Sequence, residues 1–210
     1  MPRNKLTKKE IFFAAVDFFS DRGFKQCTMQ EIADQVNIKA PSIYKHFANK
    51  KEILLEIFDY YKNNLNKHRL PVEKVVDAID HEPLSKVFTK LFVTFETEEE
   101  YTLMMKISKI VIGMSYENKE AKKIFQLIFI EEPTKYLNDV FTRLINSGKI
   151  KTFDYEALTF QIIAFSLMIF EIGLLEGTDR KEIDTRYNNG IALLARGFER
   201  ADLLVNKTDS

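Results

Sequence analysis

The segment from residue 28 to residue 50 holds the side chains best suited to bind an outside partner. Hydroxyl, phenol, ammonium and imidazole groups follow one another closely at Ser42, Tyr44, Lys45 and His46. Such groups bond phosphate oxygens and the edges of bases. The sequence offers no pairing of a nucleophile with a base and no metal-ligand spacing. These residues therefore predict nucleic-acid binding rather than catalysis.

Two short helices joined by a tight turn are predicted to position these groups. Thr28 and Glu31 have the spacing of a capping box, in which hydroxyl and carboxylate satisfy backbone donors at a helix start. Asn37 tolerates the left-handed conformation that ends a helix and turns the chain sharply. Pro41 suits the first turn of a second helix. The pattern is that of a helix-turn-helix motif over residues 28–47.

The inner and outer faces of the second helix follow from its spacing. Ile43 and Phe47 lie four residues apart and are expected to face inward, which leaves the polar side chains between them exposed. Asn49 and Glu52 repeat the capping pattern, so another helix is expected to begin there. Lys50 lies in its first turn, where an ammonium group and a helix N-terminus together favour a phosphate.

These residues resemble the DNA-binding segment of the TetR family of bacterial transcriptional regulators. The resemblance covers roughly residues 5–65 and rests on Thr28, Ile32-Ala33, the run Pro41-Ser42-Ile43-Tyr44-x-His46-Phe47, and Lys50. The chain departs from the family pattern at Asn37, where Gly is usual, at Lys39, where a capping Ser is common, and at Pro41, where Gly is frequent. These departures affect the expected operator sequence rather than DNA binding.

The resemblance implies an all-α homodimer. Its N-terminal part is expected to be a three-helix helix-turn-helix DNA-binding domain, and its C-terminal part a helical ligand-binding and dimerisation domain, with about nine helices in total. Carried over by position, Thr28, His46 and Lys50 hold phosphates, while Tyr44 holds a phosphate or leans on a thymine methyl. The alternative is that Tyr44 and His46 only cap and pack a short helix. The full predicted DNA-binding set is Thr28, Gln30, Lys39, Ala40, Pro41, Ser42, Tyr44, Lys45, His46 and Lys50.

The formal net charge of zero conceals two oppositely charged parts. Residues 1–70 carry 13 Lys and Arg against 8 Asp and Glu, whereas residues 71–210 carry 18 against 23. The positive part attracts the DNA backbone, and its binding should weaken as salt rises. The single Cys27 cannot form an intramolecular disulfide, and the N-terminal residues lack the apolar core of a signal peptide. A reducing, cytoplasmic setting is expected.

Four regions are expected along the chain. Residues 1–6 are predicted to form a flexible arm, and residues 7–68 the DNA-binding domain with a connecting helix. Residues 69–203 are predicted to form the ligand-binding and dimerisation domain, and residues 204–210 a tail. Within the first domain, Thr7 and Glu10 suggest a capping box, and Gly23 is placed to end that helix.

The rest of the chain keeps a helical period without alternating strand signals. Pro133 interrupts one segment, which is either two helices or one kinked helix. Ala157 to Phe170 is uncharged and apolar on nearly all sides, so it is expected to be buried against its own chain on one side and against a second protein surface on the other. The run is shorter than the ~20 residues of a membrane span. With the last helix it could form a four-helix dimer interface. The predicted interface residues are Leu158, Ile162, Ile169, Tyr187, Ile191, Leu194 and Phe198.

Aromatic and methionine side chains in the second domain could line an adaptable apolar pocket. The resemblance implies a small inducer there, and a lipophilic one is expected. The predicted lining is Phe88, Phe92, Phe95, Met104, Met105, Phe125, Phe129 and Phe165. His68 and His81 lack metal-ligand spacing, and three acids at residues 98–100 are explained by the dipole of a helix start. No cofactor and no metal are expected.

The sequence thus favours a repressor that a ligand releases from operator DNA, with no membrane partner. Two alternatives stay open. One is a DNA-binding activator or architectural protein that needs no inducer. The other is a helical lipid-binding or enzymatic domain, against which the lack of a catalytic constellation argues.

Overall fold

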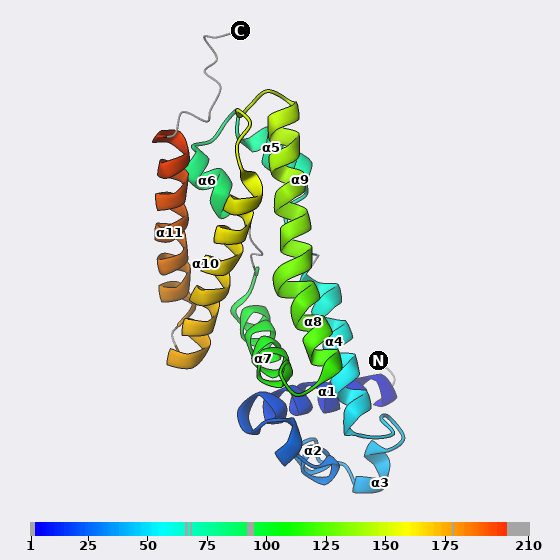
Figure 1. Ribbon diagram of the computed structural model, residues 1–210. Coiled ribbons are helices and arrows are strands. Elements are labelled where there is room, and N and C mark those ends of the chain that lie inside the picture. Colours follow the sequence, from blue (N-terminus) through cyan, green and yellow to red (C-terminus); the bar gives the residue numbers. More distant parts are fainter. Residues whose placement is uncertain (1–2, 66, 68, 92–94, 178, 201–210) are drawn as a thin grey trace. The chain divides into compact units, whose positions relative to one another are not determined.

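The computed structural model describes residues 3–65, 67, 69–91, 95–177 and 179–200, with the backbone alone described at residues 3–6, 84 and 198–200. All regular elements of these residues are helical, which confirms the predicted all-α fold class (Figure 1). Their labels run to α11, beyond the about nine helices predicted, because some of the predicted segments divide into shorter helices. The chain forms two compact units: unit 1 contains residues 1–67 and 95–125, and unit 2 the remainder.

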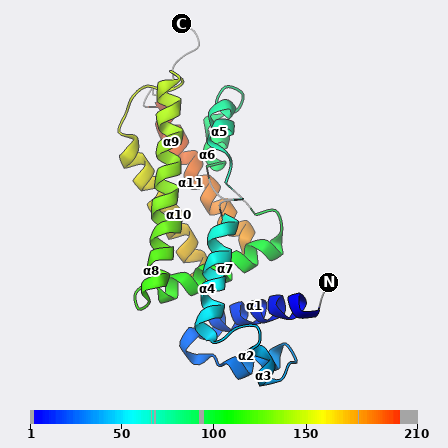
Figure 2. The ribbon, with the colours of Figure 1, turned by 90° about the vertical axis from the view of Figure 1, so that its right-hand side faces the viewer.

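Unit 1 is organised around α1, which packs against α2, α4 and α7, while α4 also packs against α7 (Figure 2). Its elements are α1 (Arg3–Arg22), the 3-10 helix η1 (Phe24–Gln26), α2 (Met29–Gln35), α3 (Ala40–Ile43), α4 (Lys50–Leu65), α7 (Glu98–Met114) and most of α8 (Lys119–Gln126). The helix spacing explains the core, because Ile53, Leu54, Ile57 and Phe58 of α4 are all buried.

Helix α1 ends where the sequence predicted but begins earlier than predicted. Gly23 has a φ of 83° and follows directly after the helix, which confirms the predicted terminator. The helix begins at Arg3, however, four residues before the predicted start at Thr7. Lys and Leu are good helix formers, so the residues before Thr7 are helical too, and the helix does not start at the predicted capping box of Thr7 and Glu10. The predicted arm is therefore helical from Arg3 onward.

Polar contacts attach α7 to the N-terminal helices. The buried hydroxyls of Tyr61 and Ser108 hydrogen-bond at 2.5 Å between α4 and α7. The ammonium of Lys106 lies 2.8 Å from the carboxylate of Asp17 on α1. Residues 95–125 therefore share a compact unit with residues 1–67, although the sequence grouped them with the second domain.

Unit 2 has a core shared by five helices. Its elements are α5 (Val72–Ala78), α6 (Leu84–Thr89), the π-helix η3 (Leu127–Glu131), α9 (Glu132–Asn146), α10 (Tyr155–Glu176) and α11 (Arg180–Arg200). Helix α9 packs against α5 and α10, and α11 packs against α6 and α10. Phe141 of α9 is fully buried and contacts the rings of Phe88 and Phe153 edge-on. The core is therefore built within the unit.

The segment around Pro133 is one continuous helical run rather than two separate helices. It passes from α8 through η3 into α9. Proline has no N–H to donate, and the wider π turn directly before it changes the hydrogen-bond register. The hydroxyl of Thr134 donates to the carbonyl of Ile130 at 2.6 Å, which satisfies one of the backbone acceptors there. Helix α9 ends at Asn146, and Gly148 follows with a φ of 71°.

Helices α10 and α11 approach each other closely at two glycines. A Cβ atom on Gly190 of α11 would lie 2.1 Å from Cζ of Phe165, and one on Gly173 of α10 would lie 2.5 Å from Cδ1 of Ile183. Side chains larger than hydrogen do not fit at these positions without movement of the neighbour. The two glycines therefore set how tightly the pair packs.

Helix α10 is longer than the uncharged run that the sequence singled out. It has 22 residues, so it exceeds the uncharged 14-residue run and is long and apolar enough to cross a membrane by length and composition. The whole helix thus reaches the length of a span, although the uncharged run that the sequence singled out does not. Within its most apolar 18-residue window, only 17% of the residues are buried. One such helix is weak support for a membrane span, since helices at protein interfaces have the same composition.

Candidate nucleic-acid interface

The start of α2 is held by the predicted capping box, which is present in full. The backbone N–H of Glu31 donates to Oγ1 of Thr28 at 3.2 Å, and the backbone N–H of Thr28 donates to Oε2 of Glu31 at 2.8 Å. The Thr28 hydroxyl also donates to that carboxylate at 2.7 Å, and Arg22 donates to its other oxygen at 2.9 Å. The hydrogen bonds from Thr28, with that from Arg22, lower the pKa of Glu31 to about 2.

The turn between α2 and α3 is made by Asn37, as the sequence predicted. Asn37 has a φ of 54° and is the one residue other than glycine with a positive φ in the described part of the chain. Asparagine reaches this conformation at low cost because its short side chain bonds locally. The next backbone N–H, that of Ile38, donates to the carbonyl of Ala33 at 3.0 Å. The turn therefore closes back on α2.

Helix α3 is a single turn that continues as a series of turns to Phe47. The backbone N–H groups of His46 and Phe47 both donate to the carbonyl of Ile43, at 2.9 and 3.0 Å. Ile43 is fully buried and Phe47 is 1% exposed, which confirms that both face inward. Tyr44, between them, is 55% exposed. The polar side chains are thus presented from a short segment anchored at two points.

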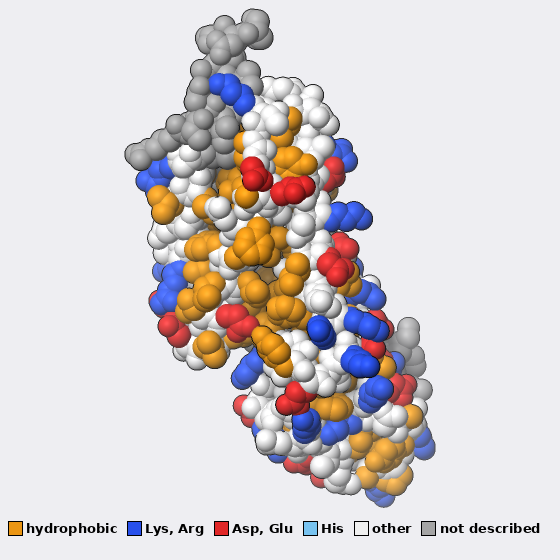
Figure 3. All heavy atoms as spheres, in the orientation of Figure 1, with side chains coloured by type: hydrophobic (Ala, Val, Ile, Leu, Met, Phe, Trp, Pro, Cys, Tyr) orange, Lys and Arg blue, Asp and Glu red, His pale blue; other side chains and the backbone are white. Residues whose placement is uncertain are grey.

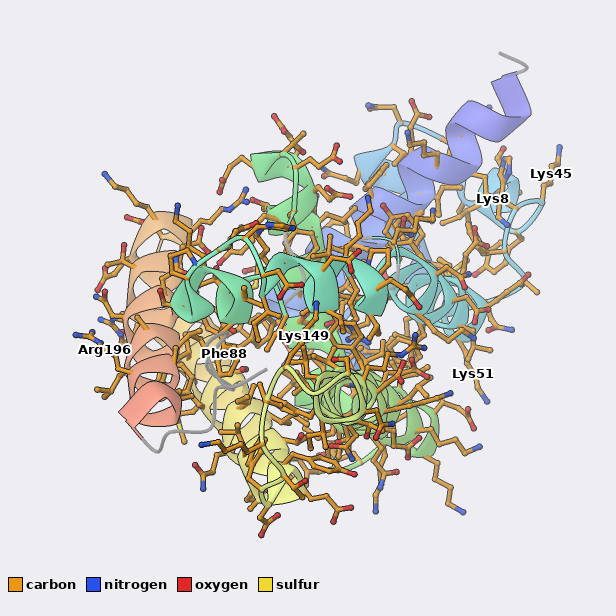
Figure 4. All side chains as sticks on the ribbon, turned by 90° about the horizontal axis from the view of Figure 1, so that it is seen from above. Lys8, Lys45, Lys51, Phe88, Lys149 and Arg196 are labelled. Atoms are coloured by element: carbon orange, nitrogen blue, oxygen red, sulfur yellow. The ribbon has the colours of Figure 1, made fainter. Side chains whose placement is uncertain are left out.

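The predicted DNA-binding residues differ in how available they are. Gln30 is exposed, but its amide donates to Asp34 at 2.7 Å. Lys45 is exposed and points away from the ribbon (Figure 4). The exposed members are Thr28, Gln30, Lys39, Pro41, Tyr44 and Lys45, and the partly buried members are Ala40, Ser42, His46 and Lys50. Their contacts with DNA stay predictions.

Two further cations lie near this surface that the sequence analysis did not select. Lys51 is exposed and points outward (Figure 4). Lys8 of α1 pairs with Glu56 at 2.6 Å, and its ammonium lies 4.9 Å from the centre of the Phe47 ring. The adjacent lysines at the start of α4 were a visible signal for Lys51, whereas Lys8 is brought near Phe47 only by folding.

A scan of protein families matches residues 11–57 to the model described as "Bacterial regulatory proteins, tetR family". Residues 11–57 therefore have the sequence of a TetR-type DNA-binding segment. One relative is the activator FasR of Mycolicibacterium smegmatis, which is 28% identical over 51% of this chain and 55% of its own length. Another is the negative regulator IcaR of Staphylococcus aureus strain Newman, which is 33% identical over 46% of this chain and 50% of its own length. The chain spans about half the length of the curated relatives it matches.

Solved structures extend the likeness of fold to the rest of the chain. A transcriptional regulator of Aquifex aeolicus VF5 superposes with a TM-score of 0.62, covering 90% of this chain and 99% of its own, at 16% sequence identity. At that identity the match shows the fold alone. The matched family model and the two named relatives are described as transcriptional regulators.

The residues predicted for a ligand pocket divide between the two units of the chain. Phe95, Met104, Met105 and Phe125 lie in unit 1, and Phe88, Phe129 and Phe165 lie in unit 2. Several are committed to packing, since Met104 and Phe88 are each 2% exposed. Within unit 2, Phe129 contacts the ring of Phe170 and Phe165 that of Tyr187. Phe92 lies outside the described residues. Neither unit by itself gathers the predicted set.

The residues predicted for a dimer interface pack largely inside unit 2. Ile162 and Ile191 are fully buried in its core, and Leu158, Tyr187 and Leu194 pack against that core. Ile169 is partly buried, and the side chain of Phe198 is not described. A different set of large apolar side chains is exposed on α10 and α11, and it consists of Phe160 at 73%, Met168 at 60%, Leu175 at 83% and Leu193 at 68%.

That exposed set had a signal in the sequence. Phe160, Met168 and Leu175 are spaced by eight and seven residues, so at 100° per residue they lie within about 80° of one another on α10. Figure 3 shows hydrophobic side chains gathered over α10. We call Phe160, Met168, Leu175 and Leu193 the exposed apolar face. The residues predicted for the interface lie on the opposite stripe, because both stripes are apolar and periodicity does not say which one meets the core.

The Glu31 carboxylate gives the helix-turn-helix a pH dependence. Because its pKa in the folded protein lies below the ordinary value of about 4.3, its ionised form stabilises the fold above that value. This contribution is lost as the pH falls from about 4 toward 2. We expect Glu31→Gln to lower the melting temperature most above pH 5 and to differ progressively less from the wild type below pH 4. Melting curves at several pH values measure this; a constant difference would contradict it.

Proposed function

We propose that the protein is a homodimeric transcriptional regulator that binds operator DNA and represses transcription until a small ligand releases it. The observation that carries DNA binding is the segment from Lys39 to Lys45, which is held on the buried anchors Ile43 and Phe47. Its exposed side chains are Lys39, Pro41, Tyr44 and Lys45. A short segment fixed at two points can enter the major groove without losing its shape. Exposed lysines beside it supply attraction for phosphates.

In the proposed complex, the α3 segment of each subunit lies in a major groove, and the two grooves are about 34 to 36 Å apart on a near-palindromic site. Base edges are read by small and amide side chains, and phosphates are held by hydroxyl, imidazole and ammonium groups. The proposed base-facing residues are Gln30, Ala40, Pro41 and Ser42, and the proposed phosphate-facing residues are Thr28, Tyr44, Lys45 and His46.

The proposed homodimer is supported by the exposed apolar face. Four large apolar side chains, at least 60% exposed, lie on two helices that also pack together. Large apolar side chains that gather on one exposed surface mark an association site. A second copy of the chain is its proposed occupant, since α10 and α11 of two copies can form a four-helix contact.

The proposed function includes repression of transcription and release of the protein from DNA by a ligand. The negative regulator IcaR is a relative that supports repression, whereas the activator FasR supports activation as the second candidate. A lipophilic ligand is supported by the many Phe and Met side chains, and release requires that it prefer the DNA-free state. A ligand that saturates the protein without changing operator affinity would contradict release. The cytoplasm, where operator DNA lies, is the proposed compartment.

The proposed function is tested by binding to the intergenic DNA upstream of the protein's own gene. Affinity is measured at several salt concentrations, with a scrambled duplex of equal length as the control. We expect tighter binding to the natural sequence and a linear fall of log affinity with log salt concentration for both duplexes. Equal affinity for the two duplexes would mean that this site is not an operator, and the same measurement on fragmented genomic DNA would then search for one.

Tyr44→Ala tests whether the exposed phenol contacts DNA or only packs its own helix. Because Tyr44 is 55% exposed, its loss should leave the melting temperature nearly unchanged. We expect operator affinity to fall about tenfold to a hundredfold, the range for losing one good contact. Tyr116→Ala, at a tyrosine that is 97% exposed, is the matched control and should bind normally. Full affinity of the Tyr44 variant would remove this residue from the interface.

A further inference from the structure

The ammonium group of Lys50, at the start of α4, is turned into unit 1. Its Nζ donates to the backbone carbonyl of Phe24 at 2.6 Å, to that of Cys27 at 2.8 Å and to that of Lys25 at 3.4 Å. It also lies 4.4 Å from the centre of the Phe24 ring. An ammonium group has three N–H donors, so these three carbonyls use all of them.

The three carbonyls belong to η1 and to Cys27, the residue directly before the N-cap of α2. Carbonyls at the end of a helical turn lack an intrahelical partner, and a lysine is a suitable donor for them. The single S–H of Cys27 is shared between the carbonyls of Phe18 and Gly23, whose oxygens lie 3.2 and 3.3 Å from the sulfur, so the end of α1 has its own donor. Lys50 therefore supplies hydrogen bonds to the backbone that connects α1 with α2.

We propose that Lys50 is a positioning residue that fixes the start of α2 to the start of α4, and that it is not a phosphate ligand. The restraint on Cys27 passes through one peptide bond to Thr28, whose capping box sets where α2 begins. Helix α2 in turn carries the turn and α3. The consequence for DNA rests on the proposed function, whereas the consequence for the fold of residues 24–36 does not.

In this proposal Lys51, and not Lys50, binds the phosphate near the start of α4. Its side chain is exposed and points away from the protein (Figure 4), and it has no ion pair or hydrogen bond with any of the residues described. Lys51 shares the first turn of α4 with Lys50, so both lie near the same helix N-terminus. The two lysines thus form a matched pair in which one is structural and the other faces solvent.

Amide hydrogen exchange of Lys50→Met and Lys51→Met tests the structural half of the proposal. Methionine keeps most of the apolar stem and removes the donors. Losing charged hydrogen bonds to carbonyls should speed exchange of the amides in residues 24–36 by about tenfold to a hundredfold in the Lys50 variant. Amides of α7 should change much less, and the Lys51 variant should match the wild type. Equal change throughout unit 1, or no change, would overturn the positioning role.

The salt dependence of DNA binding tests the other half. For Lys51→Met we expect the slope of log affinity against log salt to become shallower by about one unit, because one phosphate contact is lost. For Lys50→Met we expect an unchanged slope with a reduced preference for operator over scrambled duplex. A slope shallower by about one in the Lys50 variant alone would overturn the assignment. If the wild type bound no DNA specifically, the exchange result would still decide the structural role.

A measurement on the wild type guards against a variant that fails to fold. The ammonium protons of a lysine held by three carbonyls exchange slowly enough to give a nitrogen–proton NMR signal, unlike those of exposed lysines. We expect such a signal for Lys50 and none for Lys51, and we expect it to persist unchanged when DNA is added. Absence of the Lys50 signal, or a large shift on DNA binding, would contradict the proposal.

Discussion

Replacing Phe160 and Met168 by glutamate is expected to convert the protein to a monomer and to lower operator affinity by at least about a hundredfold. Both side chains belong to the exposed apolar face of α10, at 73% and 60% exposure, so the charges should not disturb the core of a single chain. In a homodimer each charge would be buried against an apolar partner surface, which is strongly unfavourable. Binding of two half-sites by one molecule would then be lost.

The measurement combines sedimentation of the variant with its operator affinity at one salt concentration. Tyr116→Glu is the matched control, because it places the same charge on a tyrosine of unit 1 that is 97% exposed. We expect this control to stay dimeric and to bind normally. A double variant that remains dimeric would show that the exposed apolar face does not form the interface, and one that is monomeric yet binds fully would separate dimerisation from DNA binding.

Asn37→Val is expected to have the second largest effect, because it forces a β-branched residue into a left-handed conformation. The φ of Asn37 is 54°, and this region costs ordinary residues about 1–2 kcal/mol or more. We expect the melting temperature to fall by roughly 2–8 °C, at about 2–4 °C per kcal/mol for a chain of this size. We also expect a large loss of operator affinity, because the turn sets the direction of α3.

Asn37→Gly is the matched control for the turn. Glycine adopts a positive φ without steric cost, so this variant should keep the turn and should bind DNA about as well as the wild type. Circular dichroism melting and DNA binding of both variants give the comparison. If the valine variant melted and bound like the glycine variant, backbone conformation at residue 37 would not limit the motif.

Local chemistry in the sequence was sufficient for the helix-turn-helix. The capping box at Thr28 and Glu31, the left-handed Asn37 and the inward Ile43 all occur as predicted. Each depends on residues within about one helical turn of one another, so a linear sequence contains the required information. The match to the tetR family model was also contained there, because the matched residues 11–57 include this motif.

Only the tertiary structure decided features that depend on distant parts of the chain. The sequence assigned Lys50 to phosphate, whereas folding brings its ammonium onto carbonyls about 25 residues earlier in the chain. The sequence grouped α7 with the second domain, whereas Tyr61 and Ser108 join it to α4. These contacts leave no periodic trace in either segment.

The same limit explains the exposed apolar face. Helix α10 is apolar nearly all round, so its sequence predicts two buried surfaces but does not say which one lies against its own chain. Packing assigned Ile162 to the core and left Phe160 and Met168 in solvent. The sequence by itself therefore determined the fold class, the likeness to TetR-type regulators and the helix-turn-helix motif. The orientation of each helix face, which depends on packing between remote segments, was decided by the tertiary structure alone.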